Sequence, residues 1–171
     1  MAALIKFIMF NFTLSFFVLG MLIAAMQILR IPPAQRTPAL KYETVFKWFL
    51  IFSVGASYFY NFIVHTFFGD VSARFIGWAN SPFQLEVGFA SLGYAVVGFI
   101  AFKNNWWLRL AAVVGPGLFM LGAAGGHVYQ MIVAHNFAPG NAGIMFYSDI
   151  FLPLFGVLML WLTRPSVQAK P

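Results

Sequence analysis

The hydrophobic positions of this chain fall into five long runs separated by short polar breaks. The runs cover about residues 3–29, 46–68, 82–102, 106–134 and 144–162. A transmembrane helix needs about 20 mostly apolar residues, so each run is long enough to cross a bilayer. The pattern therefore predicts an all-α membrane protein, a five-helix bundle that forms a single membrane domain over residues 1–171.

The boundaries of these runs carry helix signals. The first run stops at Pro32-Pro33, and the third opens with Ser81-Pro82-Phe83-Gln84, which has the form of a capping box. Pro153 predicts a kink in the last helix. The run after Lys6 continues to Leu29 without a small-residue cleavage site, which predicts a retained first span and no cleaved signal peptide.

Composition agrees with a membrane location. Hydrophobic residues make up 61% of the chain and charged residues 8%, whereas soluble proteins carry about 25% charged residues. The formal charge of +6 is scattered along the chain, so we do not expect nucleic acid as a partner. The chain has no cysteine, which excludes disulfides and thiolate ligands. The expected surroundings are the lipid bilayer, with a membrane-protein partner or a homo-oligomer left open.

The basic residues predict the orientation, because cytoplasmic loops are enriched in Lys and Arg. One side would carry eight of them against two, Lys6 and Arg74, on the other. This distribution predicts an outside N-terminus and a cytoplasmic C-terminus. The eight are Arg30, Arg36, Lys41, Lys47, Lys103, Arg109, Arg164 and Lys170. Tryptophans at the predicted span ends agree with an aromatic belt.

Small residues predict where helices pack closely. Gly122 and Gly126 have small-xxx-small spacing in the fourth span. A similar face in the third span consists of Gly88, Ser91, Ala95 and Gly98. We interpret both faces as helix contacts in preference to a ligand groove.

Four ionisable residues fall at one predicted depth. His65, Glu86, His127 and Asp149 come from four different spans, each roughly 5–12 Å from the outer surface. Ionisable groups are costly within a membrane and often functional there. The cytoplasmic halves of the spans are expected to hold almost only apolar and small residues. We therefore predict a polar site open toward the outside.

Several chemistries fit this set. Glu86, His127 and Asp149, with His65 as a fourth ligand or a supporting group, would suit a divalent metal, but no close-spaced signature such as HExxH is present. Haem b would need His65 and His127 as axial ligands. A quinone or proton site would use His127 with a carboxylate as a relay. Candidate supporting residues are Tyr129, Gln130, Asn141, His135 and Lys6.

A non-catalytic interpretation stands beside these. Glu86 and Asp149 would then stabilise their own helix starts, and Lys6 would pair with either carboxylate. The protein would be an accessory subunit whose apolar flanks pack against a larger membrane complex. No nucleophile elbow, phosphate loop or nucleotide fingerprint is present, so whether the protein is an enzyme stays open.

Two blocks carry a resemblance to a known family. They are GWANSPFQLEVGFASLGYAVVG at residues 77–98 and GHVYQMIVAHNFAPGNAGIMFYSDIFLPLFG at residues 126–156. With the flanking sequence, over roughly residues 45–163, they resemble a family of small uncharacterised bacterial multi-pass inner-membrane proteins with no assigned activity. The resemblance implies a bacterial inner-membrane location and supplies no mechanism.

Overall fold

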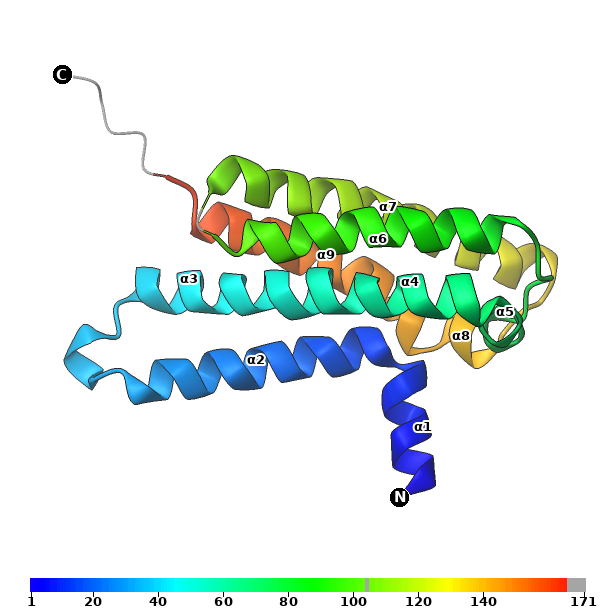
Figure 1. Ribbon diagram of the computed structural model, residues 1–171, viewed down its shortest axis with the longest axis horizontal. Coiled ribbons are helices and arrows are strands. Elements are labelled where there is room, and N and C mark those ends of the chain that lie inside the picture. The colour runs from blue at the N-terminus through cyan, green and yellow to red at the C-terminus, as the bar shows by residue number, and fades with distance from the viewer. Residues whose placement is uncertain (104, 166–171) are drawn as a thin grey trace.

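The computed structural model describes residues 1–103 and 105–165, and these residues form a helical bundle (Figure 1). Five helical segments are long and apolar enough to cross a membrane: Phe12–Arg30, Pro38–Phe67, Phe83–Ala101, Trp106–Val133 and Pro139–Leu162. The predicted all-α architecture with five spans is therefore confirmed. Lys170, one of the basic residues used for the orientation, lies outside the described residues.

The long helices run side by side along the bundle, and the short elements gather at its two ends. The long helices are α2 (Phe12–Arg30), α3 (Pro38–Phe49) continued by the π-helix η2 (Leu50–Ala56) and α4 (Ser57–Phe67), α6 (Phe83–Ala101), α7 (Trp106–Val133) and α9 (Ile144–Leu162). At one end lie α5 (Gly69–Ile76) and α8 (Pro139–Ala142), and we call it the α5 end (Figure 1). The 3-10 turn η1 (Pro33–Gln35) lies at the opposite end, which we call the Arg109 end.

The first span differs from its prediction. The run expected at residues 3–29 breaks at Asn11 into α1 (Ala2–Phe10) and α2, and α1 turns away from the bundle (Figure 1). The side chains of Asn11 and Ser15 donate to the carbonyls of Phe7 and Ile8, at 2.9 and 3.1 Å, where the helix would otherwise continue. The 19 residues of α2 rise about 28 Å, so α2 without α1 is nearly as long as the hydrocarbon core of a bilayer is thick.

Two other predicted boundaries were wrong. The second span begins at Pro38, eight residues before the predicted start at 46, because Thr37 caps that helix by accepting from the Leu40 backbone N–H at 3.3 Å. The capping box at Ser81 does not form: α6 begins at Phe83 with no side-chain cap. The fourth and fifth spans begin at the predicted residues, Trp106 and Ile144.

Close contact between α6 and η2 depends on two glycines. A Cβ added to Gly98 would lie 2.6 Å from the Gly55 backbone nitrogen, and one added to Gly55 would lie 2.6 Å from the Phe99 ring. Gly88, Ser91 and Ala95 are also buried, so the predicted small-residue face of α6 is confirmed. The matching prediction for α7 was wrong at Gly122, which faces open space.

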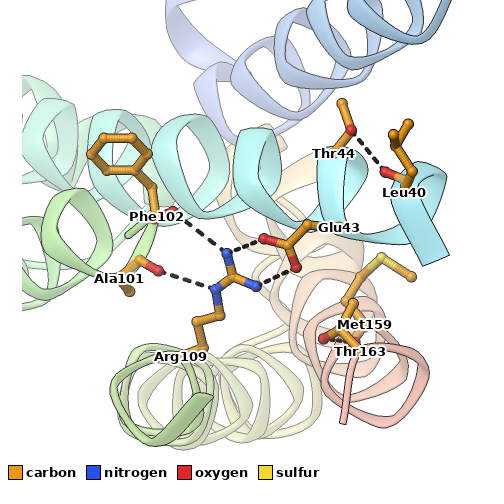
Figure 2. A network of polar contacts seen from close by, with 8 residues as sticks. All are labelled: Leu40, Glu43, Thr44, Ala101, Phe102, Arg109, Met159 and Thr163. Atoms are coloured by element: carbon orange, nitrogen blue, oxygen red, sulfur yellow. Dashed lines mark hydrogen bonds and ion pairs between the residues drawn. The ribbon is translucent and has the colours of Figure 1, made fainter. Parts of the chain in front are cut away.

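An ion pair at the Arg109 end also departs from the prediction. Arg109, expected as a connection charge, is only 2% exposed and reaches from α7 to Glu43 of α3 through two contacts of 2.6 and 2.7 Å (Figure 2). It also donates to the carbonyls of Ala101 and Phe102, at 3.2 and 3.4 Å, which end α6. This end of the bundle is therefore not purely apolar, because Arg109 joins three helices there.

We expect Gly98→Leu to destabilise the protein by about 1–3 kcal/mol, since the side chain would have to push α6 off η2. The measurement is the thermal midpoint of the detergent-purified protein. Gly93→Leu is the matched control on the same helix, because a Cβ there meets nothing within 4 Å. Equal midpoints for the two variants would contradict this account of the contact.

We expect Glu43→Leu to be more destabilising than Arg109→Met. The first change leaves a buried guanidinium without its carboxylate, whereas Glu43 is 39% exposed and can be hydrated when alone. The double variant should regain stability relative to Glu43→Leu, with a coupling of at least about 1 kcal/mol in a double-mutant cycle. Additive losses in thermal midpoint would show that the pair contributes nothing.

Candidate functional site

The candidate site lies toward the α5 end, where Asn141 and His127 are both buried. Asn141 of α8 is 0% exposed, and its carbonyl oxygen Oδ1 contacts two side chains. It accepts from the indole Nε1–H of Trp78 at 2.9 Å and lies 2.8 Å from Nδ1 of His127. Its amide nitrogen donates to the backbone carbonyls of His127 and Asn136, at 3.2 and 2.9 Å. One amide thus connects α7, α8 and the segment after α5.

The local chain path explains how Trp78 reaches this position. Gly77 ends α5 with φ +78, a left-handed conformation that glycine adopts without a Cβ clash. Asn136, in the turn after α7, donates to the carbonyls of Ile76 and Gly77 at 3.0 and 3.2 Å. These bonds hold the end of α5 against the turn and place the Trp78 indole beside His127, with ring centroids 5.5 Å apart.

His127 faces Asp149 with its second ring nitrogen. Nε2 of His127 lies 3.4 Å from Oδ2 of Asp149, a separation within the range of an ion pair and longer than a typical hydrogen bond. Both residues are buried, at 7% and 8% exposure. Next to Asp149, Ser148 accepts from the Thr13 hydroxyl at 3.0 Å, which ties α2 to the same part of α9. The predicted meeting of His127 and Asp149 at one depth is thus observed as a contact.

A cavity of about 420 Å³ opens beside this pair, and its lining comes from almost every helix at this end. His127, Asp149 and His65 line it, together with Asn61 and Ser72. The remaining lining is apolar and rich in aromatic rings: Phe10, Phe12, Tyr60, Phe75, Trp78 and Phe119. The size and the few convergent polar groups are typical of a small-molecule site.

His65 contributes to the cavity from α4. Its Nδ1 contacts Oε1 of Gln84 on α6, and its Nε2 lies 3.3 Å from the Ser72 hydroxyl on α5. Both ring nitrogens of His65 and both of His127 therefore already have protein partners. This geometry does not favour the predicted axial pair for haem, because neither ring presents a free nitrogen to the cavity.

The predicted metal set is not brought together. Glu86 is exposed on α6 and does not line the cavity. Within residues 1–103 and 105–165, no group of three or more His, Cys, Asp or Glu side chains could hold a metal ion. Of the four predicted ligands, His127 and Asp149 are in direct contact. Glu86 is kept away from them because it lies on a different face of α6 from the one that packs on α4.

Of the predicted supporting residues, one belongs to the site and the others lie away from the cavity. Asn141 is central to the site, but Tyr129 is 60% exposed on the outside of α7, and Gln130 does not line the cavity. His135 is exposed with φ 48, because α7 ends at Val133 and the turn carries the ring off the His127 face. Lys6 is exposed on α1 and lies 5.9 Å from the Phe10 ring centroid. Among the described residues it forms no salt bridge with Glu86 or Asp149.

Sequence reasoning missed Trp78 as a site residue and Glu43 as the partner of Arg109. Trp78 lies between the second and third predicted spans, where an aromatic belt at the membrane surface already accounts for a tryptophan. Its position two residues after the end of an amphipathic segment gave no sign that its N–H bonds a residue 63 positions later. Nothing in the sequence around Glu43 indicates that its carboxylate pairs with a buried arginine 66 positions later.

Comparison with known proteins places the chain in a family but gives no activity. The chain belongs to the family of unknown function DUF6790, whose model matches residues 10–169. No curated protein matches the chain significantly. No solved structure matches it significantly either. With five long apolar helices, the protein is a multi-pass membrane protein of that family.

We expect Asn141→Leu to destabilise the protein by about 3 kcal/mol, because it removes the bonds to the Trp78 N–H, to Nδ1 of the buried His127 and to two backbone carbonyls. Asn61→Leu is the matched control, since it loses one bond to Ser91 and should cost about 1 kcal/mol. Thermal midpoints in detergent compare the two. A smaller loss for Asn141→Leu than for the control would contradict the assigned role.

Proposed function

We propose that this protein binds a small lipophilic molecule in the cavity at the α5 end, with the His127–Asp149 pair holding the ligand's polar group. The observation that carries this proposal is one buried polar pair beside a cavity of about 420 Å³ whose lining is mostly apolar and rich in aromatic rings. A purely structural pair would not need such a space, since interiors normally pack without voids larger than a water molecule.

The surroundings of the cavity support entry from the bilayer. Met9, Phe10 and Phe12 line it at the corner between α1 and α2, where α1 turns away from the bundle (Figure 1). Apart from Phe10, every residue of α1 is exposed. In a membrane, this corner faces lipid, so a molecule dissolved in the bilayer has a direct approach.

The proposal includes the orientation and location. With the α5 end outside, the basic residues of the Arg109 end lie in the cytoplasm, as the positive-inside rule requires. Arg109 no longer counts as a free loop charge, but the remaining basic residues of that end still outnumber Lys6 and Arg74. In a bacterial inner membrane, the cavity then lies in the periplasmic half of the bundle.

The test uses the absence of cysteine in the chain. Ala123, on α7, lines the cavity, whereas Ala111 on the same helix is exposed on its outside. Single variants Ala123→Cys and Ala111→Cys are placed in lipid nanodiscs and labelled with N-ethylmaleimide. The labelling rates are compared with and without three probes: decylubiquinone, neopentylbenzene and benzyltrimethylammonium.

We expect at least one probe to slow labelling at position 123 several-fold and to leave position 111 unchanged, because only the former position shares the cavity with the ligand. Ala123→Phe, which fills the cavity, should remove binding of that probe, and Ala111→Phe should not. If no probe protects position 123, or if both positions are protected equally, the cavity is not a binding site. In that case the accessory-subunit interpretation is preferred.

A further inference from the structure

The hydrogen bonds around Asn141 place a hydrogen on Nδ1 of His127. The indole N–H of Trp78 can only donate, so the Asn141 atom facing it is the oxygen. The opposite atom faces the carbonyls of His127 and Asn136, which can only accept, and is therefore the NH₂ group. Nδ1 of His127, 2.8 Å from the same oxygen, must then carry a hydrogen and donate it.

The pair of His127 and Asp149 consequently holds one further proton. With Nδ1–H directed at Asn141, Nε2 and the Asp149 carboxylate face each other across 3.4 Å. Without a proton there, an ionised carboxylate would be buried beside a neutral ring with no compensating charge, which is costly. With one proton, the pair is either imidazolium and carboxylate or neutral imidazole and carboxylic acid. Both arrangements are neutral overall.

Within residues 1–103 and 105–165, no Lys or Arg side chain lines the cavity to compensate the charge of Asp149. The other titratable groups facing it come from α4: His65, whose nitrogens contact Gln84 and Ser72, Tyr60, and nearby Tyr58, whose hydroxyl donates to the Pro116 carbonyl at 2.8 Å. Loss of the shared proton would therefore leave one net negative charge in a space surrounded by aromatic rings.

We propose that the cavity binds a lipophilic cation, held by Asp149 and the surrounding aromatic rings, and that this cation displaces the proton shared by Asp149 and His127. The faces of Trp, Tyr and Phe attract cations within about 6 Å of the ring centre. Trp78, Tyr60 and Phe119 line the cavity that Asp149 also faces. This inference rests on the proposed function and names the ligand class for the same site.

The exchange balances in charge and atoms. The cation enters with one positive charge, and one proton leaves the space between Nε2 of His127 and the Asp149 carboxyl group for water. His127 keeps the hydrogen on Nδ1, still donates it to Asn141, and is neutral. Asp149 is ionised and is the counter-ion of the cation. The net charge of the site is therefore the same before the cation binds and after it has bound. The only covalent bond broken is the one to the released proton.

The test compares two probes of the same shape and different charge. Benzyltrimethylammonium is a cation, and neopentylbenzene replaces its nitrogen with carbon. Binding to the full chain in nanodiscs is measured by protection of Ala123→Cys, and proton release by titration calorimetry in buffers of different ionisation enthalpy. We expect the cation to bind at least tenfold more tightly than the neutral probe and to release one proton per molecule bound.

The pH dependence follows from competition between proton and cation for Asp149. While the pair is protonated, the apparent Kd of the cation should fall by up to tenfold for each unit of rising pH, and that of the neutral probe should not change. Asp149→Asn should lose proton release and the preference for the cation but still bind neopentylbenzene. If this variant does not fold, the proton count on the unmodified chain decides alone.

The outcomes separate the two proposals. If neopentylbenzene or decylubiquinone protects position 123 but benzyltrimethylammonium does not, or if the cation binds without proton release, the cation exchange is wrong and the lipophilic site stands. If no probe protects position 123, both proposals are wrong.

Discussion

Much of the α5 end depends on a single requirement: a buried polar group in apolar surroundings needs a partner. The side chain of Asn141 meets this requirement through four contacts, to Trp78, to the ring and backbone of His127, and to the backbone of Asn136. An isolated amide buried in such a place costs several kcal/mol. The helix ends that supply these partners are therefore held in one arrangement, and the His127 ring is held with them.

The same requirement explains the opposite end. Arg109 is buried because Glu43 and two carbonyls at the end of α6 compensate its charge (Figure 2). The two ends of the bundle differ in how closely the protein packs around the buried charged or polar groups. The Arg109 guanidinium makes two contacts with one carboxylate and two more with backbone, whereas His127 and Asp149 leave a loose 3.4 Å contact beside a cavity. The first arrangement suits a fixed connection between helices, and the second leaves space beside the pair, as the proposed ligand site requires.

Hydropathy predicted the helices well because burial in lipid requires long, continuous apolar segments with internal hydrogen bonds. The boundaries at Trp106 and Ile144 agree with the apolar runs, and at Trp106 the Asn105 side chain also caps the helix by accepting from the Leu108 backbone N–H. Boundaries were wrong where local side chains decided them: Thr37 begins a helix eight residues early, and Asn11 and Ser15 interrupt an apolar run that hydropathy cannot divide. The α6 face of Gly88, Ser91, Ala95 and Gly98 was predicted because small residues there leave room for a neighbouring helix. Gly122 has the same spacing but faces outward, since spacing does not say which side of a helix meets the bundle.

The sequence alone determined that this is a multi-pass helical membrane protein and that His127 and Asp149 lie at similar depths, because depth follows from position along a helix. Only the tertiary structure decided which of the residues at that depth meet. Rotation about each helix axis turns Asp149 toward His127 and leaves Glu86 and Tyr129 on exposed faces. That rotation is set by packing, by glycine contacts and by the partners of Asn141, and depth carries no information about it. The polar layer predicted from the sequence is thus one buried pair, with His65 lining the same cavity. Of the residues that contact the pair, Asn141 lies between His127 and Asp149 in the sequence, whereas Trp78 comes from a distant part of the chain.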